Sequence, residues 1–239
     1  MSAGTTRVAL RRDGSLDLSV GAFSPKVLHR GPQTARVALV GTRALLLAGD
    51  HVDVHVEVED GCALELVEVA ATVAYNGRGG PAARWDVHLG LGAGALLVWE
   101  AQPLVVADGA DVDRDLHADL DGGALLALRE TIVLGRTGES GGRLRARTTA
   151  EMDGVPLLVE DLDLRETSLR SSPAVLGSSR QLETVAVLGR RVEHPDALQL
   201  EGPGTLVRSL VPGGTSACWA AVRADLLTAP RGTDTLPPT

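Results

Sequence analysis

Three short stretches of this chain repeat one pattern, in which small residues are followed by Ala-Leu and then by a hydrophobic run. They are Asp60-Gly61-Cys62-Ala63-Leu64, Gly92-Ala93-Gly94-Ala95-Leu96 and Asp121-Gly122-Gly123-Ala124-Leu125. The alanine that precedes each leucine is the fourth residue of its stretch, and these alanines are 32 and 29 positions apart. Each stretch follows a strand-like segment. A repeated strand–turn–strand unit is typical of chains whose units stack on one another. The pattern therefore predicts an all-β protein of stacked, solenoid-like sheets.

The segment from Val52 to Val58 alternates most regularly between valines and polar residues. Its valines point to one face, while His51, Asp53 and His55 point to the other, as expected for a half-buried strand. Measured from the repeated pattern, its polar face is one residue out of phase with that of residues 115–120. We expect a β-bulge to absorb this difference.

The rest of the chain is also predicted to form short strands, with a helix only near the C-terminus. Residues 7–20 contain Asp13-Gly14, which indicates a hairpin, and residues 185–187 and 206–210 are expected to be late strands. Residues 216–227 are rich in alanine, with Trp219 at helical spacing from later apolar residues, and Thr215 or Ser216 is expected to cap this helix. We predict a single domain over residues 1–229, one or two short helices towards the C-terminus, and a disordered tail at 230–239.

Composition excludes several classes of partner. The net charge is -8, Lys26 is the sole lysine and aromatic residues make up 2% of the chain, which argues against nucleic acid and anionic membrane surfaces. The longest apolar span, residues 37–48, is interrupted and too short to cross a bilayer. Cys62 and Cys218 form neither a zinc pattern nor a disulfide framework. We expect a cytoplasmic protein.

The polar face of the Val52–Val58 strand is the most direct candidate for chemistry. Alternate residues on a strand lie about 6.5–7 Å apart, so neighbouring imidazole and carboxylate groups of His51, Asp53, His55, Glu57 and Glu59 are within range of a shared nickel or zinc ion. A metal-dependent hydrolase built on this face is our alternative function. The same residues are also what an ordinary solvated sheet face presents.

Recognisable catalytic motifs are missing from the sequence. It contains no G-x-S-x-G, no H-E-x-x-H and no Walker A sequence, and the glycine-rich residues 76–81 are not followed by G-K-[ST]. We therefore predict that the chain is not an enzyme and holds no tightly bound cofactor.

The stretch from Ala124 to Glu139 combines an apolar run with charged residues at its centre and its end. Arg129 and Glu130 stand in the middle of the run, which stops at a G-R-T-G-E corner. Glycines on both sides of Arg136 predict a sharp turn. The simplest interpretation is a buried strand that ends in a turn whose charges face water.

This stretch is one of several that, in order, resemble the urease accessory protein UreD family (UreH in some species). The matching segments are Ser24-Pro25 with Leu28 and Arg30, Leu47-Ala48-Gly49-Asp50, Ala70-Ala71-Thr72 with Tyr75, Trp99-Glu100-Ala101-Gln102-Pro103, Asp108-Gly109-Ala110, Glu130, and Gly135-Arg136-Thr137-Gly138-Glu139. Their order and spacing carry the resemblance, which runs from about residue 24 to residue 164. Val73 stands where the family has a lysine, so no contact of that lysine is carried over.

The resemblance implies a non-enzymatic maturation factor with a largely β fold. UreD proteins bind apo-urease together with UreF and the GTPase UreG, and nickel is delivered to the urease active site through that assembly. A nickel conduit through UreD has been proposed for the family. For this chain the resemblance thus implies transient nickel and those three protein partners.

Three acids lie at or beside motif positions of the family. We nominate Asp50, Glu130 and Glu139 as weak nickel-relay or scaffold-interior acids, and expect Arg136 to pair with one of them. A conduit has to hold its ion loosely, and carboxylates bind nickel more weakly than cages of imidazoles or thiolates do. A purely structural role as turn charges remains open for each of them.

Overall fold

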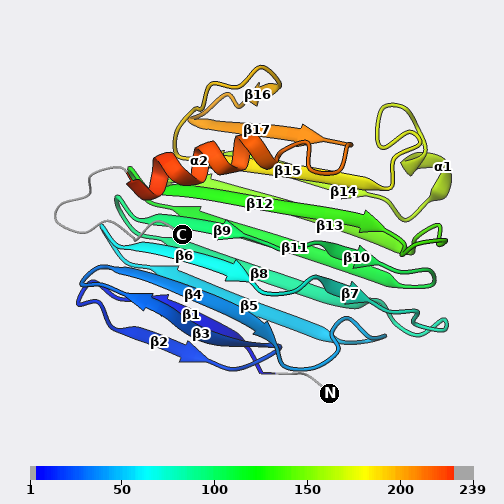
Figure 1. Ribbon diagram of the computed structural model, residues 1–239, viewed down its shortest axis with the longest axis horizontal. Helices are drawn as coiled ribbons and strands as arrows, with labels where there is room; N and C mark the ends of the chain where they lie inside the picture. Colours follow the sequence, from blue (N-terminus) through cyan, green and yellow to red (C-terminus); the bar gives the residue numbers. More distant parts are fainter. Residues whose placement is uncertain (1–3, 229–239) are drawn as a thin grey trace.

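The computed structural model describes residues 4–228, which form two β-sheets packed face to face (Figure 1). The seven-stranded sheet has the order β14-β13-β11-β8-β5-β1-β2, and the ten-stranded sheet has the order β16-β17-β15-β12-β9-β6-β4-β3, with β10 and β7 paired beside β12. The fold is therefore all-β and stacked, as the repeat predicted.

The strands of the seven-stranded sheet are β1 (Thr6–Leu10), β2 (Leu16–Ser19), β5 (His51–Val58), β8 (Ala83–Leu91), β11 (Asp111–Leu120), β13 (Arg143–Met152) and β14 (Val155–Asp163). Those of the ten-stranded sheet are β3 (Phe23–Arg30), β4 (Thr34–Gly41), β6 (Ala63–Glu68), β7 (Thr72–Ala74), β9 (Leu96–Glu100), β10 (Leu104–Val106), β12 (Leu125–Leu134), β15 (Gln181–Leu188), β16 (Ala197–Gln199) and β17 (Gly204–Ser209). The predicted hairpin and late strands are confirmed by β1–β2, β15 and β17.

The middle of the chain coils by crossing from one sheet to the other at every turn. Strands β5, β8, β11 and β13 are parallel neighbours in one sheet, and β4, β6, β9 and β12 are parallel neighbours in the other. Antiparallel strands flank this coil, including the β1–β2 and β3–β4 hairpins at its start and β13–β14 at its end. The repeated sequence unit is thus one turn of a two-layer solenoid.

The prediction of a β-bulge between the repeats is wrong. Strands β5, β8 and β11 pair continuously, without a shift in register. In the neighbouring sheet Ala63 pairs with Leu96 and not with Ala95. The alanine-based alignment of the first two repeats was therefore displaced by one residue, and the apparent difference in phase came from that displacement.

Glycines with positive φ occupy equivalent positions in the turns of the three repeats. Gly61, Gly94 and Gly123 have φ values of 69°, 66° and 76°. The amide of Gly61 donates to the carbonyl of Ala93, and that of Gly94 donates to the carbonyl of Gly122, so adjacent turns stack on one another. Because residues with a Cβ are strained in this left-handed region, the turn selects glycine.

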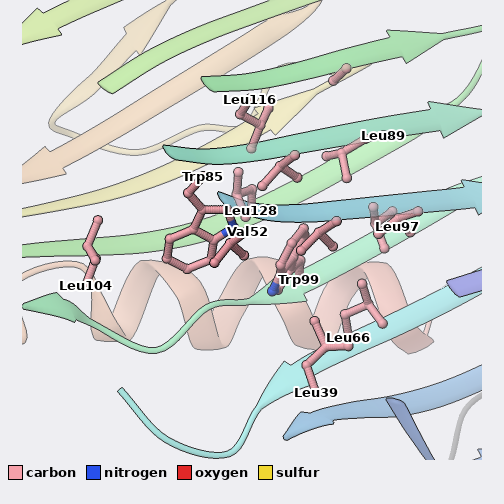
Figure 2. Packing of buried hydrophobic residues seen from close by; sticks show 14 of the residues in the cluster. Leu39, Val52, Leu66, Trp85, Leu89, Leu97, Trp99, Leu104, Leu116 and Leu128 are labelled. Atoms are coloured by element: carbon pink, nitrogen blue, oxygen red, sulfur yellow. The ribbon is translucent and has the colours of Figure 1, made fainter. Parts of the chain in front are cut away.

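Apolar side chains of both sheets meet in the space between them. Along β5 every second residue is buried, which confirms the alternation predicted for Val52 to Val58. Figure 2 shows Leu97 and Trp99 of β9 in one cluster with leucines of both sheets and with Trp85, which lies on β8 of the seven-stranded sheet. With so few aromatic residues, the core consists mainly of leucine, valine and alanine.

Two short helices follow the coil, as predicted. Helix α1 (Thr167–Arg170) is a single turn, and α2 (Ser216–Thr228) lies across the outer face of the ten-stranded sheet near β12 (Figure 1). Its buried residues Trp219, Val222 and Leu226 pack in one cluster with Val98 and Val185. No helix within residues 4–228 has the length and apolarity needed to cross a membrane. The predicted tail at 230–239 lies outside the described residues.

A buried carboxylate holds the start of α2 against the sheet. Glu183 on β15 is 2% exposed and accepts hydrogen bonds from the amides of Gly213 (2.6 Å) and Thr215 (3.1 Å) and from the Thr215 hydroxyl (2.8 Å). Burial acts to raise the pKa of Glu183, but these hydrogen bonds and Arg129 outweigh it and hold that pKa below its usual value. The hydroxyl of Thr215 therefore donates to Glu183, and the carbonyl of Thr215 accepts the first hydrogen bond of the helix, from the Trp219 amide.

Replacement of a turn glycine tests the coil. We expect Gly94→Val to lower the free energy of unfolding by about 1–2 kcal/mol, because a β-branched residue is strained at positive φ although no atom lies within 4 Å of the added Cβ. Urea denaturation measures the effect. Gly90→Ala in β8 is the control, since its Cβ also meets no atom within 4 Å and its φ is not left-handed. Equal losses in the two variants contradict the role of the turn conformation.

Removal of the Glu183 carboxylate tests the attachment of α2. Glu183→Ala leaves the buried amide and hydroxyl of Thr215, and the partly buried amide of Gly213, without this acceptor, so we expect a loss of about 2–4 kcal/mol in urea denaturation. Since the pKa of Glu183 is lowered, its contribution is present at neutral pH and disappears as pH falls through that pKa. The exposed Glu193→Ala serves as control. A loss no greater than that of the control contradicts the assignment.

Candidate functional site

A cavity lies between the two sheets, lined mostly by apolar side chains but also by several charged ones. Its volume is about 70 Å³, which is room for a few water molecules. Its charged lining residues come from both layers. They are Glu68 (β6), Arg114 (β11), Glu130 (β12), Glu160 (β14) and Arg208 (β17). Because ionisable groups rarely line a protein interior without a role, this interlayer cavity is the first candidate site.

Glu68 is the most deeply placed of these acids. It follows Leu64 and Leu66 on the inward face of β6 and is 5% exposed. Its Oε2 accepts the Gln102 amide at 3.1 Å, whereas its Oε1 is buried and has no hydrogen-bond partner within the described chain. Desolvation raises the pKa of Glu68 from 4.5 to about 7. Glu68 is therefore partly protonated near neutral pH.

Arg114 and Glu130 form an ion pair that joins the two sheets. The Arg114 guanidinium donates to the Glu130 carboxylate, and it also lies over the Trp85 ring, 5.4 Å from the ring centre. The side chain of Arg114 is 9% exposed and that of Glu130 is 23% exposed. Arg114 thus places a positive charge beside the carboxylates of Glu130 and Glu68.

A second ion pair between the layers, Arg208 with Glu160, lines the cavity and is more exposed to solvent. Arg208 donates to Glu160 at 2.6 Å, and each side chain is 29% exposed. The lining thus changes from the buried Glu68, through Glu130, to the partly exposed Glu160. Three carboxylates thus line one cavity: Glu130 and Glu160 are each paired with an arginine, and Glu68 has a raised pKa.

Asp50 and Glu139, nominated together with Glu130, lie elsewhere, at turns between strands. Asp50 is buried, accepts the Leu47 amide at 3.1 Å and pairs with Arg43 at 3.3 Å. Its observed contacts stabilise the turn before β5. The structure therefore separates Asp50 and Glu139 from the cavity that Glu130 lines.

Arg136 pairs with Glu139 within the G-R-T-G-E corner. Its Nε donates to Glu139 Oε1 at 2.9 Å, and the amides of Arg136 and Asp108 donate to Oε2 at 2.9 and 3.1 Å. Hydrogen bonds from Arg136 lower the pKa of Glu139 to about 2. The carboxylate is thus occupied by four donors, counting a second nitrogen of Arg136, and ties this turn to its neighbour.

His51 and His55 share the outer face of β5 but have different partners. His51 Nε2 lies 2.7 Å from Asp86 Oδ2 on β8, while His55 Nε2 lies 3.1 Å from Asp53 Oδ1 on its own strand. The ring of His55 also faces that of His88 on β8. His51 and His55 therefore do not converge on one point: His51 contacts β8, whereas His55 stays beside Asp53 of its own strand.

Four of the five charged cavity residues, Glu68, Arg114, Glu160 and Arg208, were not singled out from the sequence. Glu68 stands two positions after Leu66, so the strand period that placed the leucines inward also placed it inward. Arg114 likewise alternates with Val112 and Leu116. Glu160 carried no comparable signal, because its partner Arg208 lies 48 positions away.

The fold and the cavity together define a two-layer β-solenoid with an ionisable interior, and comparison with known proteins gives its family. The model of the family described as UreD urease accessory protein matches residues 21–230. The chain belongs to the UreD urease accessory protein family.

Similar proteins from three Streptomyces species support this assignment. "Urease accessory protein UreD 1" of Streptomyces griseus subsp. griseus is 48% identical over 214 residues, which cover 86% of this chain and 84% of that protein. "Urease accessory protein UreD" of Streptomyces avermitilis is 34% identical, with 93% and 91% covered. The protein of that name from Streptomyces coelicolor is 36% identical, with 74% and 75% covered.

The raised pKa of Glu68 makes stability depend on pH. Between about pH 4.5 and 7 the folded chain keeps a proton on Glu68 that the unfolded chain has lost, so the free energy of unfolding falls as pH rises through this range. We expect Glu68→Gln to remove this slope and to be more stable than wild type at pH 8 by up to about 3 kcal/mol. Urea denaturation at several pH values measures it, and parallel curves for the two proteins contradict it.

Proposed function

We propose that this chain is a non-catalytic scaffold of urease maturation, which binds apo-urease together with UreF and the GTPase UreG while nickel is inserted. Membership of the UreD family supports this role, as do the names of its relatives, all of which are urease accessory proteins. The lack of a recognisable catalytic motif in the sequence agrees with it. In this proposal nickel is cargo, and no cofactor is held tightly.

The interlayer cavity is the observation on which the nickel part of the proposal rests. Its carboxylates are oxygen ligands, which hold nickel less tightly than clustered imidazoles or thiolates do. Glu130 is paired with Arg114, and Glu68 is partly protonated near neutral pH. An ion that reaches Glu68 has to displace that proton to solvent, and it is released again when the proton returns. Such competition favours passage over trapping.

The two cysteines support a cytoplasmic location. Cys62 and Cys218 are both free and buried, so each packs as a small apolar side chain. Free thiols are typical of a reducing compartment, and we place the assembly in the cytoplasm. The acidic net charge of -8 supports protein partners over nucleic acid.

Neutralising one cavity acid tests the role of the cavity. We expect Glu68→Gln and Glu130→Gln to assemble with UreF, UreG and apo-urease but to slow nickel insertion at limiting nickel. A loss of about 1.4 kcal/mol of ion stabilisation slows insertion about tenfold. Co-purification measures assembly, and the nickel content and activity of urease after addition of nickel and GTP measure insertion.

Glu100→Gln is the matched control, because Glu100 lies on the same sheet but pairs with Arg129 at 3.3 Å outside the cavity. It is expected to support nickel insertion at the wild-type rate. If all three variants load urease like wild type, nickel does not depend on the cavity acids. If the wild-type chain fails to co-purify with urease and its other factors, the scaffold proposal itself is wrong.

A further inference from the structure

The outer face of the seven-stranded sheet carries a row of histidines. His55 on β5 pairs in register with His88 on β8, which pairs in register with His117 on β11. Parallel neighbours lie about 4.8 Å apart, and side chains of paired residues project to the same face of a sheet. In the sequence His55 and His88 are more than thirty residues apart, and His88 and His117 are nearly thirty apart. In the fold their three imidazoles lie side by side.

Two of these histidines and one aspartate converge closely. The rings of His55 and His88 are 4.7 Å apart between centroids, and His55 Nε2 lies 3.1 Å from Asp53 Oδ1. One possible ligand atom from each of Asp53, His55 and His88 lies within 4.8 Å of the other two. Asp53 and His55 of β5 alone supply two nearby ligand groups, and His88 on β8 adds the third.

The carboxylate of this cluster is oriented by a further hydrogen bond. The Thr5 hydroxyl donates to Asp53 Oδ2 at 2.6 Å, which leaves Oδ1 directed towards His55. Hydrogen bonds to the second oxygen of a ligating carboxylate are a common feature of metal sites. Arg7, which pairs in register with His55, is held by Glu57 at 3.0 Å, so its charge is compensated.

His88 differs from the next histidine along the row. His88 is exposed and makes no hydrogen bond within residues 4–228. His117, in contrast, uses Nδ1 towards the Thr149 hydroxyl at 2.8 Å and Nε2 towards Asp119 at 3.1 Å. His88 is therefore free to act as a ligand, whereas His117 is already engaged on both ring nitrogens.

We propose that Asp53, His55 and His88 form a surface site for a divalent transition metal ion such as Ni²⁺ or Zn²⁺. Two imidazoles and a carboxylate are ligands suited to such ions. Metal–nitrogen bonds of about 2.0–2.1 Å bring tetrahedral ligands to about 3.4 Å from one another, so side-chain rotations of His88 and His55 close the site. The remaining coordination positions belong to water, which makes the bound ion exchangeable.

This site is independent of the interlayer cavity and of the proposed function. On β5 the valines on both sides of His55 are buried between the sheets, whereas Asp53 and His55 face outward. The sheet thus separates the two locations. Metal binding at the outer face is a property of the chain by itself and does not require urease or its partners.

Titration of the full-length chain with Ni²⁺ alone, and separately with Zn²⁺, tests the proposal. We expect one exchangeable ion whose affinity falls at least about tenfold in His88→Gln and in His55→Gln, since loss of an outer-shell partner alone already costs about 10–100-fold. Ni²⁺ should also raise the melting temperature of wild type but not of His88→Gln. X-ray absorption of the bound nickel should show two imidazoles.

His117→Gln is the matched control, because it removes the neighbouring histidine of the same row and is expected to keep wild-type affinity. Unliganded His88→Gln should melt like the unliganded wild type, as its side chain is exposed. The proposal is overturned if wild type binds neither ion at micromolar concentration, if the His55 and His88 variants retain wild-type affinity, or if His117→Gln loses as much as they do. Urease activation is not the readout, so failure here leaves the proposed function untouched.

Discussion

The structure depends on parallel strands of successive turns stacking in register, which lets backbone amides and carbonyls of each turn bond to the next. Such stacking requires turns that reverse direction within a few residues and leave the next turn room to approach. Glycines at positive φ meet this requirement at Gly61, Gly94 and Gly123. Once register is fixed, equivalent residues of each turn lie in rows, which produces the apolar interior and the polar outer face alike.

The fold could be predicted from the sequence because its signals are local. Alternation along residues 52–58, the repeated small-residue turns and the alanine-rich segment near the C-terminus each specify one element from neighbouring residues. The register between turns was missed by one residue, because Ala63 and Ala95 look alike in the sequence although Ala63 pairs with Leu96. Only hydrogen bonding between turns distinguishes these alignments.

The candidate sites were less accessible to sequence reasoning, because they join residues of different turns. Glu130 was nominated for its motif position, yet its environment is set by Arg114, on the opposite sheet, and by Glu68, an earlier acid that no motif indicated. On the outer face, His55 was recognised but its neighbour His88 was not assigned a partner. In both places the strand period gave the direction of each side chain, and the fold gave its neighbours.

The flanking strands have a consequence for self-association. A parallel coil with bare ends presents rows of free amides and carbonyls on which another copy can add, as in filaments. Here the outermost strands are unsuited to such addition, since β2 and β16 are short and β3 and β14 contain Pro25 and Pro156. These edge strands therefore disfavour end-to-end addition of another copy.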